Sequence, residues 1–220
     1  MIDLISNSKV ITVRGSGKVS APPDWIVIDL DLMAEEMKYS DTLNSAARQL
    51  DQLRQSLYSV DFAKEDIKTK RFYVDTVYSS YKDENDNYHR VFEGYKARHD
   101  LYIAFDFDND RLEKIINALT NSAANPEFSL DYTIKDKVAV KNQLLKNAVS
   151  DARKKAEILV EAAGVKLGEV LRVDYDWTEV RFSHDYSISR EHSMMLSESL
   201  DFVPEEVKAS DNVTVVWAIA

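Results

Sequence analysis

The sequence has no cysteine, only 5 glycines and 4 prolines, and no long apolar run. Without cysteine, disulfides, thiolate nucleophiles and Cys-ligated zinc are excluded. No stretch approaches the roughly 18 apolar residues that a membrane-spanning helix needs. The first residues also lack the basic segment and apolar core of a signal peptide. These absences favour a cytoplasmic protein without a membrane span; if a leader has been removed, the periplasm becomes the expected compartment.

The composition is that of a soluble globular protein, with 45% hydrophobic and 30% charged residues. The 28 basic and 38 acidic residues give a net charge of −10. Such a charge repels nucleic acids and anionic lipids, so we expect no nucleic-acid partner. The length fits a single domain over residues 1–220, or two intertwined subdomains, with an irregular loop at residues 178–208.

Side-chain periodicity predicts an α+β protein. Period-two alternation predicts strands at residues 9–20, 25–34, 66–81, 88–107, 128–134, 170–177 and 213–219. Helical spacing predicts helices at residues 40–59, 111–121 and 136–164. We expect antiparallel sheets built from hairpins, with one long and two shorter helices packed on them. The first two strands should form a hairpin, and Ser40 or Asp41 should cap the first helix.

The helix at residues 136–164 carries small residues along its apolar side. Ala148, Ala152 and Ala156 recur every four residues, so they lie on one face. Small side chains at this spacing allow a neighbouring layer to approach closely. Gly164 stands where a left-handed residue normally ends a helix.

Two sequence patterns resemble ligand sites, and neither predicts one. Gly15-Ser16-Gly17 is followed by a strand and not by the helix that a phosphate loop requires. The glycine pair suggests a bulge in the first strand or a close approach of another backbone, and a bulge is the favoured interpretation. His184 and His192 stand beside Asp185 and Glu191, but their spacing matches no zinc motif.

No catalytic, cofactor-binding or metal-binding residue is therefore assigned, and no cofactor is expected. The acidic residues of the strands are interpreted as a solvated face. The alternative is a small-ligand protein, a metal-binding protein or an enzyme whose site lies near the loop at residues 178–208.

The hairpin predicted at residues 66–107 contains many aromatic side chains. Tyr78, Tyr81 and Tyr88 lie near its tip, where one protomer can bury them least. Tyrosine is common at protein interfaces because its ring is apolar and its hydroxyl is polar. These three residues are the candidate contacts with a second copy of the chain or with another protein.

Several motifs, in this order, resemble the SIMPL-domain family. They are ITVRGSGKVSAPPD, Ile67-Lys68-Thr69, Phe92-Glu93-Gly94-Tyr95, DARKKAE, and the segment from Gly164 to Gly168. The resemblance covers residues 9–177 and the last strand. It implies a mostly uncharacterised bacterial family with periplasmic, immunogenic members, ring-like homo-oligomers and proposed links to stress tolerance. It implies no catalytic residues, so the leading interpretation is a non-enzymatic protein that assembles with itself or binds a partner.

Overall fold

The computed structural model describes residues 9–175, 184–186 and 203–220. These residues form three α-helices and two antiparallel sheets, which confirms the α+β class. The chain divides into two compact units. The first unit combines the described parts of Met1–Pro23, Ile134–Ser183 and Glu205–Ala220. The second unit combines those of Asp24–Thr133 and His184–Pro204.

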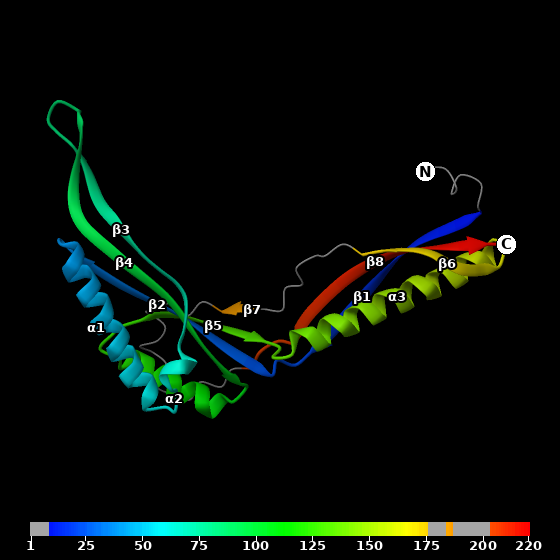
Figure 1. The fold of residues 1–220 in the computed structure, drawn as a ribbon, viewed down its shortest axis with the longest axis horizontal. Helices are drawn as coiled ribbons and strands as arrows, with labels where there is room; N and C mark the ends of the chain where they lie inside the picture. The colour runs from blue at the N-terminus through cyan, green and yellow to red at the C-terminus, as the bar shows by residue number, and fades with distance from the viewer. Residues whose placement is uncertain (1–8, 176–183, 187–202) are drawn as a thin grey trace. The chain divides into compact units, whose positions relative to one another are not determined.

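The first unit is a three-stranded sheet with one long helix on one face (Figure 1). Its strands lie in the order β1 (Val10–Ala21), β8 (Val207–Ile219) and β6 (Leu167–Asp174). The helix α3 (Lys137–Ala162) begins where the Asp136 carboxylate accepts a hydrogen bond from the Ala139 N–H at 2.8 Å. It ends before Gly164, whose φ of +71° is left-handed, as the sequence predicted.

Helix α3 approaches strand β1 so closely that β1 needs glycine. Ala148 and Ala152 are fully buried, and a Cβ on Gly15 would lie 2.0 Å from the Ala148 carbonyl oxygen. A Cβ on Gly17 would lie 1.9 Å from the Leu144 carbonyl oxygen. The expected close approach of the alanine face is confirmed. The expected bulge is wrong: β1 pairs with β8 without a register shift.

Side chains of α3 also cover the open edge of β1. Edge strands expose unpaired N–H and C=O groups that can pair with other chains. Three α3 residues, spaced four apart, bond to such groups. Asp151 accepts from the Ser16 N–H at 2.7 Å, Asn147 donates to the Lys18 carbonyl at 3.0 Å, and Lys155 donates to the Arg14 carbonyl at 3.4 Å. The helix therefore closes this edge as well as one face.

The second unit is a five-stranded sheet with two helices on one face (Figure 1). Its strands lie in the order β3 (Lys68–Lys82), β4 (Tyr88–Asp106), β2 (Trp25–Glu36), β5 (Glu127–Thr133) and β7 (His184–Tyr186). The helices are α1 (Tyr39–Tyr58) and α2 (Asn109–Thr120), and a short 3₁₀ turn, Lys64–Asp66, precedes β3.

The core of the second unit lies between its sheet and its helices. Alternate residues of β2 are buried, and leucines and isoleucines of α1 and α2 pack on them. The buried members include Ile26, Ile28, Leu30, Leu53, Leu57, Leu112 and Ile115. The intervening residues of β2 must therefore point to the opposite face of the sheet.

Three local expectations are wrong. Strands β1 and β2 do not form a hairpin, because β1 pairs with β8 and β2 pairs with β4 and β5. Neither Pro22 nor Pro23 between them has an N–H with which to continue a ladder. Helix α1 begins at Tyr39, with Lys38 as an N-cap that makes no side-chain bond, so Ser40 and Asp41 lie inside the helix. Within the predicted irregular loop, His184–Tyr186 forms the strand β7.

No helix among the described residues is long and apolar enough to cross a bilayer. Helix α2 has its N-cap at Asp108, whose carboxylate accepts a hydrogen bond from the Arg111 N–H at 3.1 Å. The turn between β3 and β4 lies at residues 83–87, where a polar segment predicted it. Local signals therefore placed most helix and strand ends within a few residues.

Replacing Gly15 with alanine should destabilise the first unit, because the new methyl group would meet a helix carbonyl. Overpacking of this kind costs about 1–3 kcal/mol. Urea unfolding measures the loss in free energy of unfolding for Gly15→Ala. The control is Ser16→Ala, which keeps the strand backbone unchanged. Equal midpoints for the two variants would contradict the close packing of α3 on β1.

Replacing Asp151 with asparagine should lower the melting temperature at neutral pH. The hydrogen bond from Lys155, followed by that from the Ser16 N–H, lowers the pKa of Asp151. A lowered folded-state pKa contributes stability above the unfolded-state value, about 3.9, and this contribution disappears as pH falls through the folded-state pKa. The difference in melting temperature between wild type and Asp151→Asn should therefore become smaller in acid. The control is Asp174→Asn, which removes only an exposed pair with Arg172. A difference in melting temperature that stays constant from pH 7 to pH 2 would contradict the contribution of the lowered Asp151 pKa to stability.

Candidate functional site

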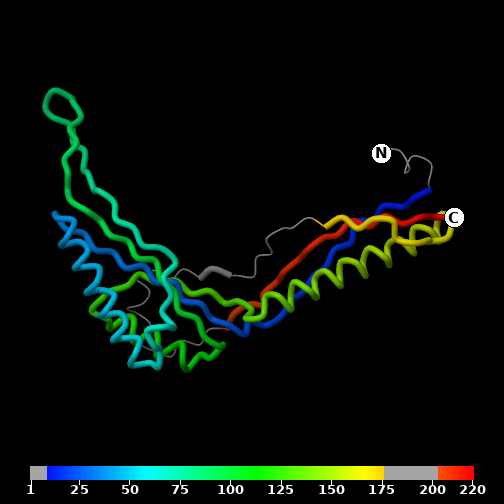
Figure 2. Tube along the Cα trace, viewed as in Figure 1, coloured from blue at the N-terminus to red at the C-terminus, as the bar shows by residue number. Residues whose placement is uncertain are grey.

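Strands β3 and β4 continue beyond the rest of their sheet as a two-stranded arm. The ladder between β2 and β4 ends at Glu36 and Tyr95. The ladder between β3 and β4 continues to Lys82 and Tyr88. Figure 2 shows this arm as the pair of blue-green to green tubes that are joined by a loop at the far end. We call residues 77–94 the arm. Among the described residues, no third strand pairs with it.

A row of aromatic rings connects the base of the arm to α1. Tyr39 of α1 meets Tyr95 at 5.5 Å between ring centroids, and Tyr95 meets Phe92 at 5.3 Å. Phe92 meets Tyr78 at 5.5 Å, and the guanidinium of Arg90 lies 3.8 Å from the Tyr78 ring centroid. Edge-on ring contacts and cation–π contacts each add to the stability of a solvent-exposed ribbon. These contacts therefore fix the positions of the aromatic side chains at the base of the arm.

The three tyrosines predicted as contacts are exposed on this arm. Tyr78, Tyr81 and Tyr88 have exposed fractions of 42%, 53% and 77%. Tyr81 stacks on His89 at 5.3 Å, and the ammonium of Lys82 lies 5.0 Å from the Tyr88 ring. Their exposure agrees with the expectation that one protomer cannot bury them. Their contact with a partner stays a prediction.

The loop at the end of the arm is organised by one carboxylate. Asp83 accepts hydrogen bonds from the N–H groups of Asn85 and Asn87 at 2.9 and 3.0 Å. It also lies 2.8 Å from His89 Nε2. The hydrogen bond from His89, followed by that from the Asn87 backbone, lowers the pKa of Asp83. The carboxylate stays ionised and holds the loop in one shape.

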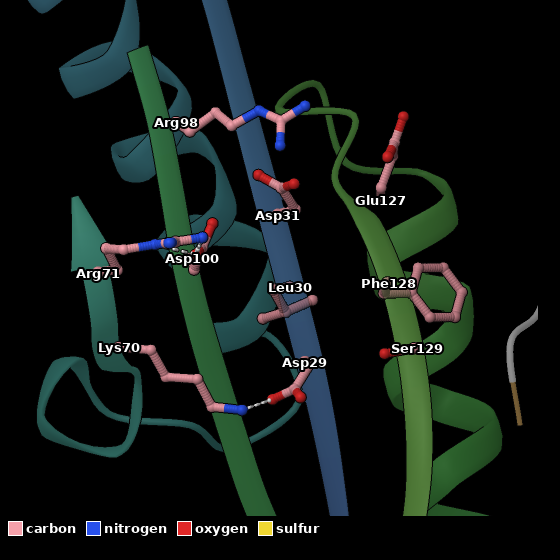
Figure 3. A pocket seen from close by; sticks show the side chains of 10 residues that line it. All are labelled: Asp29, Leu30, Asp31, Lys70, Arg71, Arg98, Asp100, Glu127, Phe128 and Ser129. Carbon is pink, nitrogen blue, oxygen red and sulfur yellow. Dashed lines mark hydrogen bonds and ion pairs between the residues drawn. The ribbon is translucent and has the colours of Figure 1, made fainter. Parts of the chain in front are cut away.

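A charged hollow lies on the same sheet, on the face opposite the helices. Its volume is about 420 Å³, and residues of β3, β4, β2 and β5 line it (Figure 3). The strand register brings Asp31 directly opposite Asp100 on one side and Glu127 on the other. Arg71 of β3 stands opposite Asp100. Three carboxylates thus occupy one row across adjacent strands.

Two ion pairs neutralise part of this hollow. The Lys70 ammonium lies 2.5 Å from Asp29, and the Arg71 guanidinium lies 2.9 Å from Asp100. In Figure 3 the side chain of Arg98 extends from β4 across β2 towards Asp31.

Asp31 is the unusual group of the hollow. Its Oδ1 is buried and has no hydrogen-bond partner among the described residues. Burial raises the pKa of Asp31, and the negative charges of Asp100 and Glu127 raise it further, whereas Arg98 and Arg71 lower it. An ionised carboxylate in these surroundings lowers the stability of the fold.

The hollow is suited to binding by charge and hydrogen bonds. Ser129 places the only hydroxyl side chain of its lining there, and the lining contains no histidine to act as a base. Within residues 9–175 and 203–220, no three histidine, aspartate or glutamate side chains gather closely enough to hold a metal ion. The sequence suggested only a solvated acidic face; the opposed carboxylates follow from the register of three strands.

The described histidine side chains, His89 and His99, make structural contacts, and the other two lie outside the described side chains. His99 is buried, with its Nε2 2.9 Å from Thr69 Oγ1 and its ring edge-on to Phe72. Burial lowers the pKa of His99, and the positive charge of Arg54 lowers it further. Its neutral ring belongs to the core. The alternative ligand site near residues 178–208 falls largely outside the described residues, including His192 and the side chain of His184.

The model of the SIMPL family, described as a protein of unknown function (DUF541), matches residues 11–217. The chain belongs to the SIMPL family. The family resemblance noted in its motifs is thereby confirmed.

Two relatives of this SIMPL protein carry the name "26 kDa periplasmic immunogenic protein". They come from Brucella melitensis and Brucella abortus, and each is 23% identical to this chain over 163 residues. The matched region is 74% of this chain and 65% of each relative, somewhat less than two thirds of their length. These names describe periplasmic proteins and lend no support to the cytoplasmic location expected for this chain.

Two solved structures from Listeria innocua cover 94% of the SIMPL chain and 92% of their own chains. An "uncharacterized conserved protein" has a TM-score of 0.23 and 10% identity. A "hydrolase" has a TM-score of 0.19 and 8% identity. At these scores neither structure assigns a fold or an activity to this protein.

Replacing Asp31 with asparagine should stabilise the protein at pH 7 by up to about 1 kcal/mol, because opposed like charges cost that much across a sheet. A raised folded-state pKa means that this cost is present when the group is ionised and disappears as pH falls through the folded-state pKa. Urea unfolding of wild type and Asp31→Asn between pH 7 and pH 3 measures the gain. Asp29→Asn, which breaks the ion pair with Lys70, is expected to show no gain. A less stable Asp31→Asn at pH 7 contradicts this account of the hollow.

Proposed function

We propose that this SIMPL protein is a non-enzymatic assembly protein, and that its arm packs against a second copy of the chain. The observation that carries the proposal is the exposure of Tyr78, Tyr81 and Tyr88 on a ribbon that pairs with no third strand among the described residues. A two-stranded ribbon by itself is at best marginally stable in water. Packing one side of the ribbon on another surface would both order the arm and remove from water Tyr78 and Tyr88, which the register places on one face.

The charges of the arm favour a second copy over an unrelated partner. The arm carries Lys82 and Arg90 together with Asp83, Glu84, Asp86 and Glu93. In a two-fold contact a patch meets itself, so it must be complementary to itself. A patch that contains both signs of charge can meet this requirement.

The names of the relatives support a periplasmic location, and we include that compartment in the proposal. The absence of cysteine is compatible with either compartment. Cell fractionation of the native protein distinguishes them, and recovery in the cytoplasm alone would refute the periplasmic assignment.

The assembly is tested by removing the rings of the arm. Sedimentation velocity at micromolar concentration should show an oligomer for the wild type. The triple variant Tyr78→Ser, Tyr81→Ser, Tyr88→Ser should dissociate at least about a hundredfold more readily, since a buried interface aromatic often contributes more than 1 kcal/mol.

The matched control is Tyr58→Ser, whose ring is 77% exposed on α1, the same fraction as Tyr88. It should sediment as the wild type does. Circular dichroism melts establish that each variant is folded. A wild-type monomer at micromolar concentration, or a triple variant with unchanged association, overturns the proposal.

A further inference from the structure

We propose that the charged hollow binds a small zwitterion, a molecule that carries a primary ammonium group and a carboxylate. A free α-amino acid with a neutral or basic side chain is the expected class of ligand. The site is made by strands β3, β4, β2 and β5, away from the tyrosines of the arm. The proposal therefore does not depend on self-assembly.

The ammonium subsite lies between Asp31 and Glu127. Residues directly opposite on antiparallel strands have Cβ atoms about 4.5–5.5 Å apart, and these two are opposite. Asp100, on the other side of Asp31, is already paired with Arg71. Neither Asp31 nor Glu127 has such a pair with another described residue, so an ammonium group bound between them would compensate two carboxylates at once.

The buried oxygen of Asp31 makes this subsite more than an acidic patch. An exposed acidic row is stabilised by water, but Asp31 Oδ1 has neither solvent nor a hydrogen-bond donor among the described residues. Leaving a buried carboxylate oxygen without a donor costs stability, more than a neutral polar group would and unlike an apolar one. Groups that destabilise a fold in this way commonly belong to binding sites.

The carboxylate subsite is Arg98. Its side chain reaches across β2 towards Asp31 in Figure 3. The planar guanidinium of Arg98 carries several N–H groups that it can donate to a ligand. A planar guanidinium binds a carboxylate with two parallel hydrogen bonds. An amino acid could therefore place its two charged groups on Asp31 with Glu127 and on Arg98.

The size and charge of the hollow fit this class of ligand. Ligand pockets commonly measure about 300–1,000 Å³, and this hollow measures about 420 Å³. Once the two ion pairs are set aside, Asp31, Glu127 and Arg98 leave one excess negative charge. A basic amino acid should therefore bind better than a neutral one, and an acidic one should bind worst.

Titration of the full chain by isothermal calorimetry tests this assignment. The probes are lysine, glycine, glutamate, cadaverine, which has ammonium groups but no carboxylate, and acetate, which has the reverse. Lysine should bind most tightly, followed by glycine, with cadaverine at least about tenfold weaker than lysine. Acetate and glutamate should show no heat of binding. Absence of lysine and glycine binding at millimolar concentration overturns the proposal.

Substitutions separate the two subsites. Asp31→Asn and Glu127→Gln should each weaken lysine binding at least about tenfold, while Asp31→Asn remains folded by its melting curve. Arg98→Gln should reduce lysine binding to the level of cadaverine and leave cadaverine unchanged. Glu113→Gln, an exposed glutamate on α2 outside the hollow, is the matched control and should bind lysine as the wild type does.

The outcomes bear on the two proposals separately. Wild-type affinity for lysine in both Asp31→Asn and Glu127→Gln overturns the ammonium subsite. Equal affinities of wild type for lysine and cadaverine overturn the carboxylate subsite. The triple tyrosine variant of the arm should bind lysine normally, whether or not it assembles, so failure of one proposal leaves the other standing.

Discussion

The pairing of β2 with a strand on each side is the constraint on which the second unit depends. Its residues Ile26, Ile28, Leu30 and Leu32 are buried beneath α1 and α2. A slip of one residue would turn this whole set towards solvent, so the core fixes the register. The same register fixes Asp31 between Asp100 and Glu127 on the opposite face. Burial of the hydrophobic core on one face of the sheet thus offsets the repulsion between the opposed carboxylates on the other face.

The arm begins where this constraint ends. At the last residue of β2, the backbone of Gly94 passes so close to the Glu36 carbonyl that a Cβ would lie 2.4 Å from its oxygen. Gly94 has a φ of +133°, and the ladder between β3 and β4 shifts register there. A bulge of this kind bends a strand pair and increases its twist. The sheet therefore carries two surfaces of different chemistry: a charged hollow within it and an aromatic ribbon beyond it.

In the first unit, the single helix α3 covers both a face and an edge of a three-stranded sheet. Its alanines allow α3 to lie against glycines of β1, and its polar residues reach the strand edge at the same time. The short distance that glycine permits is what brings side chains as short as Asn147 and Asp151 within hydrogen-bonding reach of the β1 backbone. Gly15 and Gly17 are thus explained by packing against a helix and not by a phosphate or a bulge.

The sequence by itself determined the α+β class, nearly every helix and strand, and the left-handed Gly164. Those features depend on neighbours within a few residues, so local patterns reveal them. It also pointed to the exposed tyrosines, because a hairpin tip has little to pack against. Only the tertiary structure decided that β1 pairs with β8 and that three acidic residues from separate strands form one row. Strand partners and register are chosen by the burial of a shared core between distant segments, and no local pattern contains that information.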